Sequence, residues 1–267
     1  MAIYDCFQYY NEDHIVDLRL NILNQYVDYF VISESTKNHQ GKDKKLNFDI
    51  KKFSNFENKI KYLVADPDQD LIKENHKYGH SLIEQHQRNF LINGLSKSED
   101  NDLIIISDSD EIPDLRKIKL LNKNKKFFAF SQIAYCYKLN LFNPNETNWI
   151  GSRACLKKNL TSAHKLRLIK FKNYPFWRLD KMNLQIIEGG GWHFSYLLDI
   201  DKISEKIKSF SHSEHNIKEN TDEKNIQKKL DGLKHPTNNY GLEKVVIDDS
   251  FPDYIIKNAN NLRNWIA

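Results

Sequence analysis

A continuous apolar run at residues 103–106, Leu-Ile-Ile-Ile, constrains the fold of this chain most strongly. Continuous rather than alternating hydrophobicity is typical of a strand buried on both faces, as in a parallel sheet covered by helices on both sides. The run leads directly into Ser-Asp-Ser-Asp-Glu at residues 107–111. A buried strand with carboxylates at its exit predicts an α/β fold with a polar site at one edge of the sheet.

Strand-like and helix-like segments alternate before this run. Residues 3–10, 27–35 and 59–66 are rich in aromatic and β-branched side chains, whereas residues 12–26 and 78–95 repeat apolar side chains at helical spacing. This order predicts a Rossmann-like, mostly parallel central sheet flanked by helices, with ligands at the carboxyl ends of the strands.

The second half of the chain is less regular. Residues 125–142 predict one long strand or a hairpin, and residues 199–234 are rich in lysine with a mostly helical pattern. We find no internal repeat and no linker of distinct composition. The sequence therefore predicts a single domain over residues 1–267.

Charge and cysteine content exclude several classes of protein. The 40 basic and 36 acidic residues are interleaved, giving a formal charge of +4, which favours an anionic ligand without demanding nucleic acid. Three cysteines without a CxxC pair indicate a reducing compartment, with neither a disulfide scaffold nor a zinc site. Because signal-peptide features and long apolar runs are also missing, we expect a soluble cytoplasmic protein with no transmembrane segment.

The two aspartates after the buried run, Asp108 and Asp110, can hold one divalent cation that neutralises a diphosphate. Mg²⁺ and Mn²⁺ favour carboxylate oxygens, and such a cation acts as a Lewis acid on a departing phosphate. Alternatively, Ser107, Asp108 or Ser109 caps a following helix that has Pro113 in its first turn. A D-x-D motif alone leaves both interpretations open.

Other polar residues are expected at the same edge. Asn11 and Glu12 follow the first strand, and Glu34 ends the second, where a carboxylate can accept hydrogen bonds from a ribose or a base. Arg88 and Asn89 lie in the helix before the aspartates, from which a guanidinium can reach a phosphate. The alternatives are a turn or cap for the first three and a solvated helix face for the others.

Three glycines at residues 189–191 precede Trp192 and His193. Glycines are tolerated where a chain bends sharply or lets a ligand approach the backbone. An aromatic face packs well against a sugar ring, and a neutral imidazole can bind a metal. The alternative is a glycine turn that leads into an aromatic core strand.

In order and approximate spacing, these motifs resemble glycosyltransferase family 17, which includes the β-1,4-mannosyl-glycoprotein N-acetylglucosaminyltransferase. The resemblance spans residues 4–216, and its most specific parts are "SDSDEIP" and "GGGWHFS". It implies a GT-A-like fold and inverting transfer of a sugar, GlcNAc, from a UDP-sugar with Mn²⁺ or Mg²⁺. It also implies a nucleotide-binding half at about residues 1–113 and an acceptor-side half at about residues 114–267.

The resemblance implies roles for individual residues as well. Asp108 matches an aspartate that binds the metal and the diphosphate, and Glu34 occupies a place that commonly contacts the uridine. Arg88 and Asn89 match a helix that often lies under the nucleotide. We also assign Asn11, Glu12 and Trp192 to the nucleotide-sugar site.

The predicted metal ligands are Asp110 and Asp108, with His193 or His212 completing the shell. Inverting transfer also needs a carboxylate base for the acceptor hydroxyl. Glu188, directly before the glycines, is the preferred base, and Glu111 is the second choice.

The expected partners are a UDP-sugar and a glycan or lipid-linked saccharide. The basic segment after Asp199 could contact an anionic membrane, or could be a solvated face. One rival function is a metal-dependent phosphohydrolase or nuclease built on the same aspartates. The other is a nucleic-acid-binding module, which the acids at the ligand edge argue against. We therefore expect no nucleic-acid partner.

Overall fold

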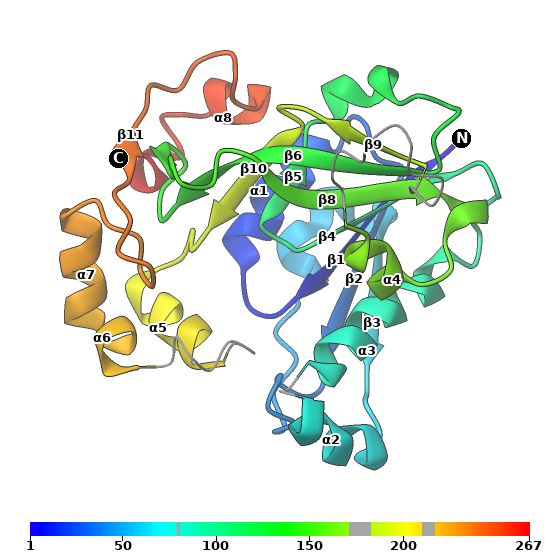
Figure 1. Cartoon of the computed structure of the whole chain (residues 1–267), viewed down its shortest axis with the longest axis horizontal. Coiled ribbons are helices and arrows are strands. Elements are labelled where there is room, and N and C mark those ends of the chain that lie inside the picture. Colours follow the sequence, from blue (N-terminus) through cyan, green and yellow to red (C-terminus); the bar gives the residue numbers. More distant parts are fainter. Residues whose placement is uncertain (79–80, 171–182, 210–216) are drawn as a thin grey trace, which may run out of the picture.

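The computed structural model of the chain describes residues 1–78, 81–170, 183–209 and 217–267. Within them a central sheet is covered by helices on both faces (Figure 1). The α/β class predicted from the sequence is confirmed.

Eleven strands of the described residues form one sheet. The strands are β1 (Ile3–Tyr9), β2 (Tyr29–Ser35), β3 (Ile60–Ala65), β4 (Leu103–Ser107), β5 (Glu111–Pro113), β6 (Phe127–Cys136), β7 (Leu141–Phe142), β8 (Trp149–Leu156), β9 (Leu184–Ile187), β10 (Gly191–Ser195) and β11 (Glu243–Lys244). The α-helices are α1 (Asp13–Leu23), α2 (Gln69–Asn75), α3 (Leu82–Phe90), α4 (Ala163–Leu168), α5 (Ile200–Ser209), α6 (Lys218–Thr221), α7 (Glu223–Asp231) and α8 (Asp253–Lys257). Shorter 3₁₀ helices are η1 (Ile50–Lys59), η2 (His76–Tyr78), η3 (Leu91–Leu95), η4 (Leu115–Leu120), η5 (Lys157–Asn159) and η7 (Arg263–Trp265).

The strand directions differ between the two halves of the sheet. The order β3-β2-β1-β4 is parallel throughout. Beyond it, β8 is antiparallel to both β4 and β6, whereas β9 and β10 run parallel to β6. Parallel pairing needs long crossover connections, which the chain supplies before β4 through α1, η1 and α3. The predicted parallel arrangement thus describes the first half, and the second half is mixed.

Strand β4 is buried on both faces, as its apolar run predicts. Leu103 and Ile105 pack into the cluster that contains α1, whereas Ile104 and Ile106 pack into the cluster beneath η3 and α4. Each of these side chains contributes about 1.5–3 kcal/mol by leaving water. The strand is therefore anchored from both sides, and this fixes the loop at its carboxyl end.

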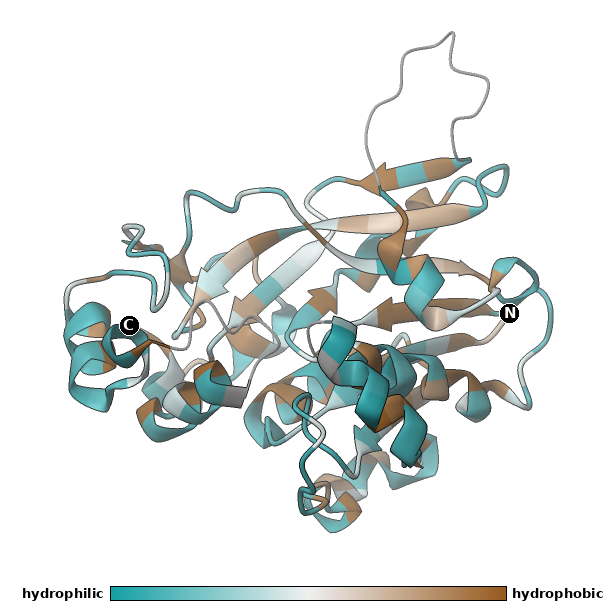
Figure 2. Cartoon of the chain, turned by 60° about the horizontal axis from the view of Figure 1, so that its bottom comes forward, coloured by the Kyte–Doolittle hydropathy of each residue, from teal (hydrophilic) through white to brown (hydrophobic). Residues whose placement is uncertain are grey.

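Helix α1 confirms the helical spacing seen in the sequence. It buries Ile15, Leu18, Ile22 and Leu23 against the sheet, while Asp13 lies in its first turn, where the helix dipole favours a negative charge. The helices carry hydrophilic segments as well as hydrophobic ones where they surround the sheet (Figure 2).

The helix-cap interpretation of residues 107–111 is wrong. Glu111–Pro113 is strand β5, which pairs with β10, so Pro113 lies in a strand and not in a helical turn. The next helical segment, η4, is capped by Asp114, whose carboxylate accepts a hydrogen bond from the backbone nitrogen of Arg116 at 3.1 Å.

The glycine run lets β10 enter between β5 and β6. Gly191 has a φ of +147°, and a Cβ there would lie 2.2 Å from the carbonyl oxygen of Ile112. A Cβ on Gly190 would lie 2.5 Å from the carbonyl oxygen of Ile187. The run therefore makes the predicted sharp bend, and the group that approaches it closely is the chain's own backbone.

Helices α5 and α7 pack on the end of β6 around a third apolar cluster that includes Tyr137, Ile203 and Ile226. The largest cluster contains residues from both predicted halves, such as Phe7 and Phe194. The boundary at about residue 113 stays a prediction. Across the described residues, every helix is too short or too polar to cross a membrane.

Candidate functional site

A cavity of about 390 Å³ lies at the carboxyl ends of β1 and β4. His39 from the loop after β2 lines it, and so does Lys206 from α5. These segments meet where Nε2 of Gln40 donates to the carbonyl oxygen of Lys208 at 3.4 Å. Five carboxylates line the cavity, and they belong to Glu12, Glu84, Asp108, Asp110 and Glu111. The polar edge predicted from the sequence therefore corresponds to a real concavity.

Two arginines hold the carboxylate of Asp108. Nη2 of Arg88 lies 3.2 Å from its Oδ1, and Nη2 of Arg167 lies 2.8 Å from its Oδ2. Burial alone would raise the pKa of Asp108, but the two guanidinium groups outweigh burial and hold that pKa well below its usual value. Asp108 is therefore charged near neutral pH.

The carboxylate of Asp110 lies between an ammonium group and an imidazole. Its Oδ2 lies 3.2 Å from Nζ of Lys206, and its Oδ1 lies 3.7 Å from Nε2 of His193. The same ammonium lies 4.0 Å from Oε1 of Glu12. Burial would lower the pKa of Lys206, but Asp110 and Glu12 raise it above its usual value. Lys206 therefore stays charged beside the second aspartate.

Glu111 is fully buried, and hydrogen-bond donors contact both of its oxygens. Nε1 of Trp149 donates to Oε1 at 2.7 Å, and Arg167 donates to the same oxygen. The backbone nitrogen of Asp108 donates to Oε2 at 3.1 Å. Glu111 therefore orders the loop through three donors on its two oxygens.

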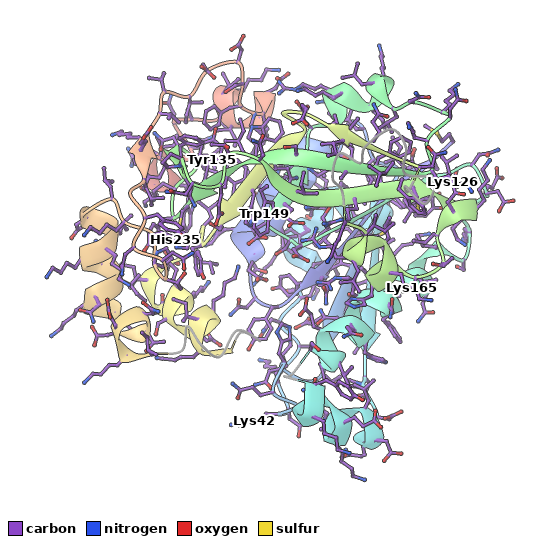
Figure 3. The ribbon with its side chains drawn as sticks, in the orientation of Figure 1. Lys42, Lys126, Tyr135, Trp149, Lys165 and His235 are labelled. Carbon is purple, nitrogen blue, oxygen red and sulfur yellow. The ribbon has the colours of Figure 1, made fainter. Side chains whose placement is uncertain are left out.

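The aromatic wall of the cavity comes from Trp149, the first residue of β8. Its ring stacks on His193 with centroids 4.7 Å apart and planes 23° from parallel, and Trp149 is labelled near the middle of the view in Figure 3. Nδ1 of His193 is buried without a hydrogen-bond partner among the described residues. An indole and an imidazole are thus stacked on each other beside Asp110.

Trp192 is not part of this wall, although the sequence suggested it. Successive side chains of a strand point to opposite faces, so His193 reaches the cavity and Trp192 enters the core. Its Nε1 donates to the carbonyl oxygen of Ser250 at 3.1 Å, and the guanidinium of Arg116 lies 5.4 Å from its ring. The alternative of an aromatic core strand is correct for this residue.

Other predicted site residues have internal partners away from the cavity lining. Glu34 is fully buried and accepts hydrogen bonds from Lys44, Tyr62 and the backbone of residues 47–48, so it anchors the loop after β2. Asn89 accepts hydrogen bonds from Ser162 and the backbone of residue 164, and so holds the start of α4.

The two predicted residues that follow β1, Asn11 and Glu12, have different roles. The carboxylate of Glu12 reaches the cavity, and its Oε2 accepts hydrogen bonds from the backbone nitrogens of Tyr10 and Asn11 at 3.1 Å each. Asn11 thus supports Glu12 through its backbone. Arg88 acts on the cavity through Glu84 and Asp108.

Glu188 is not brought to the cavity. It is exposed on the turn before β10, where its carbonyl oxygen accepts a hydrogen bond from Nζ of Lys117 at 2.9 Å. The register pairs Gly191 with Pro113 and His193 with Glu111, so the turn lies beyond the end of β10 that is remote from the aspartates. We remove Glu188 from the candidate bases. His212 lies outside the described residues.

Residues 1–233 match the profile of glycosyltransferase family 17. This chain belongs to glycosyltransferase family 17. The matched range contains the aspartates, the arginines that hold them, and Lys206. The chain is accordingly a glycosyltransferase, as its motifs predicted.

Solved structures of low identity are similar to this family 17 protein. HddC from Yersinia pseudotuberculosis, complexed with GMP-PN, is 9% identical with a TM-score of 0.34 and covers 70% of this chain and 90% of its own. A glycosyltransferase involved in glycosylation of the major capsid of PBCV-1 is 8% identical with a TM-score of 0.27, covering 60% and 62%. The cytidylyltransferase IspD from Francisella tularensis is 11% identical with a TM-score of 0.28, covering 57% and 65%. No curated protein matches this chain.

Three residues of the candidate site were not predicted. Arg167 lies in α4 and Lys206 in the lysine-rich α5, and neither position has a local pattern that separates it from solvated neighbours. Trp149 follows a polar turn. Its aromatic side chain, which can pack against a sugar or a base, was the one feature of the sequence that could have indicated a place in the site. Only long-range pairing brings these side chains to the aspartates.

The donor set of the cavity fits a divalent cation that is partly held by substrate. Of the side chains that the structure describes, no three His, Cys, Asp or Glu groups are arranged to bind a metal by themselves. Asp110 and Asp108 do present oxygens to one cavity, and Mg²⁺ commonly takes one or two protein carboxylates together with phosphates and waters. Arginines contact both oxygens of Asp108, whereas on Asp110 Lys206 contacts Oδ2 and His193 lies 3.7 Å from Oδ1, beyond hydrogen-bond distance. Oδ1 of Asp110 is therefore the better placed ligand atom.

Proposed function

We propose that this glycosyltransferase transfers GlcNAc from a UDP-sugar to a saccharide acceptor, free or lipid-linked, with inversion and with Mn²⁺ or Mg²⁺ as cofactor. The observation that carries the proposal is the charge of the cavity. Among the described residues, five carboxylates line it, and three cationic side chains, those of Arg88, Arg167 and Lys206, contact them. Within this set two negative charges are in excess, which one divalent cation would balance.

The ligands of that cation would be Asp110, together with Asp108 and the diphosphate of the donor. When bound, the cation would act as a Lewis acid on the departing nucleotide. Lys206 is the protein's own cation beside Asp110, and it would add to the stabilisation of the leaving phosphate. The Trp149–His193 stack lines the cavity, and the parts of these rings that face it would contact the donor sugar or base.

Elimination among the lining carboxylates leaves one preferred base. Glu84, Asp108 and Glu111 are each paired with an arginine, and Asp110 is assigned to the cation. Glu12 remains, with Oε1 contacted only at 4.0 Å by Lys206 among the ion pairs of the described residues. We propose that Glu12 accepts the proton of the acceptor hydroxyl, in place of Glu188.

The three cysteines are buried free thiols. They fit the reducing, cytoplasmic setting that we keep as part of this proposal.

A thermal-shift screen of UDP-sugars with and without MnCl₂ tests the function, because a ligand that binds only the folded state raises Tm by mass action. We expect UDP-GlcNAc with Mn²⁺ to give the largest rise, and the Asp110→Asn variant to lose the part that depends on Mn²⁺. Product analysis with saccharide acceptors then follows the transfer. Release of inorganic phosphate, with no shift by any UDP-sugar, would instead favour a phosphohydrolase.

A further inference from the structure

Arg19 in α1 is a fully buried arginine that the function described so far does not use. Its Nε and Nη2 donate to the two carboxylate oxygens of Asp5 in β1, at 2.7 and 2.6 Å. Both side chains are 0% exposed. The guanidinium also lies over the ring of Phe7, 4.7 Å from its centroid.

The remaining nitrogen of this guanidinium reaches the aspartate loop, which we define as residues 108–111. Nη1 of Arg19 lies 2.6 Å from the carbonyl oxygen of Glu111 and 3.3 Å from those of Asp108 and Ser109. The carbonyl oxygen of Asp110 accepts instead from the backbone nitrogen of Phe194 at 2.9 Å. Every carbonyl of the loop is thus held from within the protein, while the four side chains line the cavity.

A guanidinium is suited to this task because its donors are fixed in one plane and point in different directions. One edge of the Arg19 guanidinium donates to the carboxylate of Asp5 in β1. Its Nη1 donates to three carbonyl oxygens of the aspartate loop. The ammonium of a lysine is a compact charge that cannot span both groups. Burying such an ion pair is a poor source of stability, since apolar residues of similar volume often do as well.

We propose that Arg19 is a positioning residue, which with Asp5 sets the backbone of the aspartate loop so that Asp110 and Asp108 can hold the cation and diphosphate of the donor. This inference rests on the proposed function for its effect on donor binding. Its effect on the loop itself does not depend on any ligand.

The test is the double variant Asp5→Leu with Arg19→Met, which replaces the buried pair by apolar groups of similar size. Its Tm is expected within about 5 °C of the wild type, while its Kd for UDP with Mn²⁺ rises by about 10- to 100-fold, as for other residues that orient metal ligands. Amide hydrogen exchange of a peptide covering residues 103–113 should become faster than in the wild type. A wild-type Kd with wild-type exchange would overturn the inference.

Two further variants keep the test decisive. Arg19→Lys retains the charge opposite Asp5 and should show the same loss of donor affinity and the same faster exchange, even if the double variant does not fold. Lys229→Met is the matched control. It removes a buried cation of α7 that holds Asn220 and the carbonyl oxygen of Pro236, and should lower Tm without changing the Kd.

The readouts separate the two proposals. If the wild type binds no UDP-sugar, the proposed function fails, and the exchange of residues 103–113 still decides whether Arg19 sets the loop. If the wild type binds and Arg19→Lys binds equally well with unchanged exchange, only the role of Arg19 fails.

Discussion

The aspartate loop and the turn at residues 188–191 look equivalent in the sequence, since each places acids beside turn-forming residues at the end of a strand. In the structure they differ completely. The loop has its carbonyls and carboxylates held by internal donors and opens into the cavity. The turn is exposed at Glu188 and Gly189 and is held there by Lys117.

The difference has a simple cause in strand pairing. The aspartate loop follows the carboxyl end of β4. Glu188 lies between β9 and β10, which pair in parallel with the first and second parts of β6, and the backbone nitrogen of Gly190 donates to the carbonyl oxygen of Ser131 at 2.6 Å. The turn therefore lies beside the middle of β6. Ligands of such sheets bind at the carboxyl ends of the strands, and Glu188 lies away from the cavity that occupies this place at β1 and β4.

The largest effect is expected from Asp110→Asn in the aspartate loop. The change removes the charge that faces Lys206 and would face the proposed cation, so kcat/KM should fall by about 10²- to 10³-fold, in line with several kcal/mol of lost stabilisation. Steady-state rates over a range of MnCl₂ concentrations measure this. A variant that keeps at least a third of wild-type activity would contradict the role of Asp110.

Glu12→Gln should lower kcat by about 10²-fold or more, the usual contribution of a positioned base. The Kd for the UDP-sugar should stay near that of the wild type, because the amide keeps the shape of the side chain. Rapid-quench rates and a binding titration give the two values separately. If kcat and the affinity for the UDP-sugar fall together, or if neither changes, Glu12 is not the base.

Arg167→Met breaks the ion pairs with Asp108 and Glu111 and should lower the free energy of unfolding by about 3 kcal/mol at pH 7. The pKa of Asp108 is lower in the folded protein than in the unfolded chain. The charged Asp108 therefore contributes fully to the free energy of unfolding when the pH is above its pKa in the unfolded chain. This contribution is lost as the pH falls through its pKa in the folded protein. The difference between variant and wild type should therefore shrink toward about pH 2. Urea unfolding of the variant and the wild type between pH 7 and about pH 2 measures this difference in free energy. A difference that does not change with pH would refute the stabilising ion pair between Arg167 and Asp108.

Trp149→Phe keeps an aromatic face but removes the donor to Glu111. Because a hydrogen bond to a charged group is lost, kcat/KM should fall by about tenfold. Trp192→Phe is the control, because that indole bonds to Ser250 in the core, and it should change Tm more than kcat/KM. The reverse pattern would return Trp192 to the site.

The smallest effect is expected from Glu188→Gln. Exposed substitutions usually change free energies by less than about 0.5 kcal/mol, so kcat/KM should stay within about twofold. The chemical change equals that in Glu12→Gln, and the pair therefore compares the two regions directly. A large loss in Glu188→Gln alone would restore the base predicted from the sequence.

Local sequence patterns were sufficient where a side chain's environment is set by its neighbours along the chain. The apolar run of β4 and the helical spacing of α1 predicted burial correctly. The partners of an acid are not local, however. Glu34 and Glu111 look like free ligands in the sequence, and each is occupied by donors from distant segments.

The sequence by itself determined that a two-sided buried strand ends in carboxylates, because continuous hydrophobicity has few other uses in a chain of mixed composition. Its motifs also determined the family. Only the tertiary structure decided which acids meet, which tryptophan faces the cavity, and that Arg19, Arg167 and Lys206 gather around the loop. The reason is that strand direction and the alternation of side chains across β10 act over the whole sheet, and neither is encoded in a short stretch of sequence.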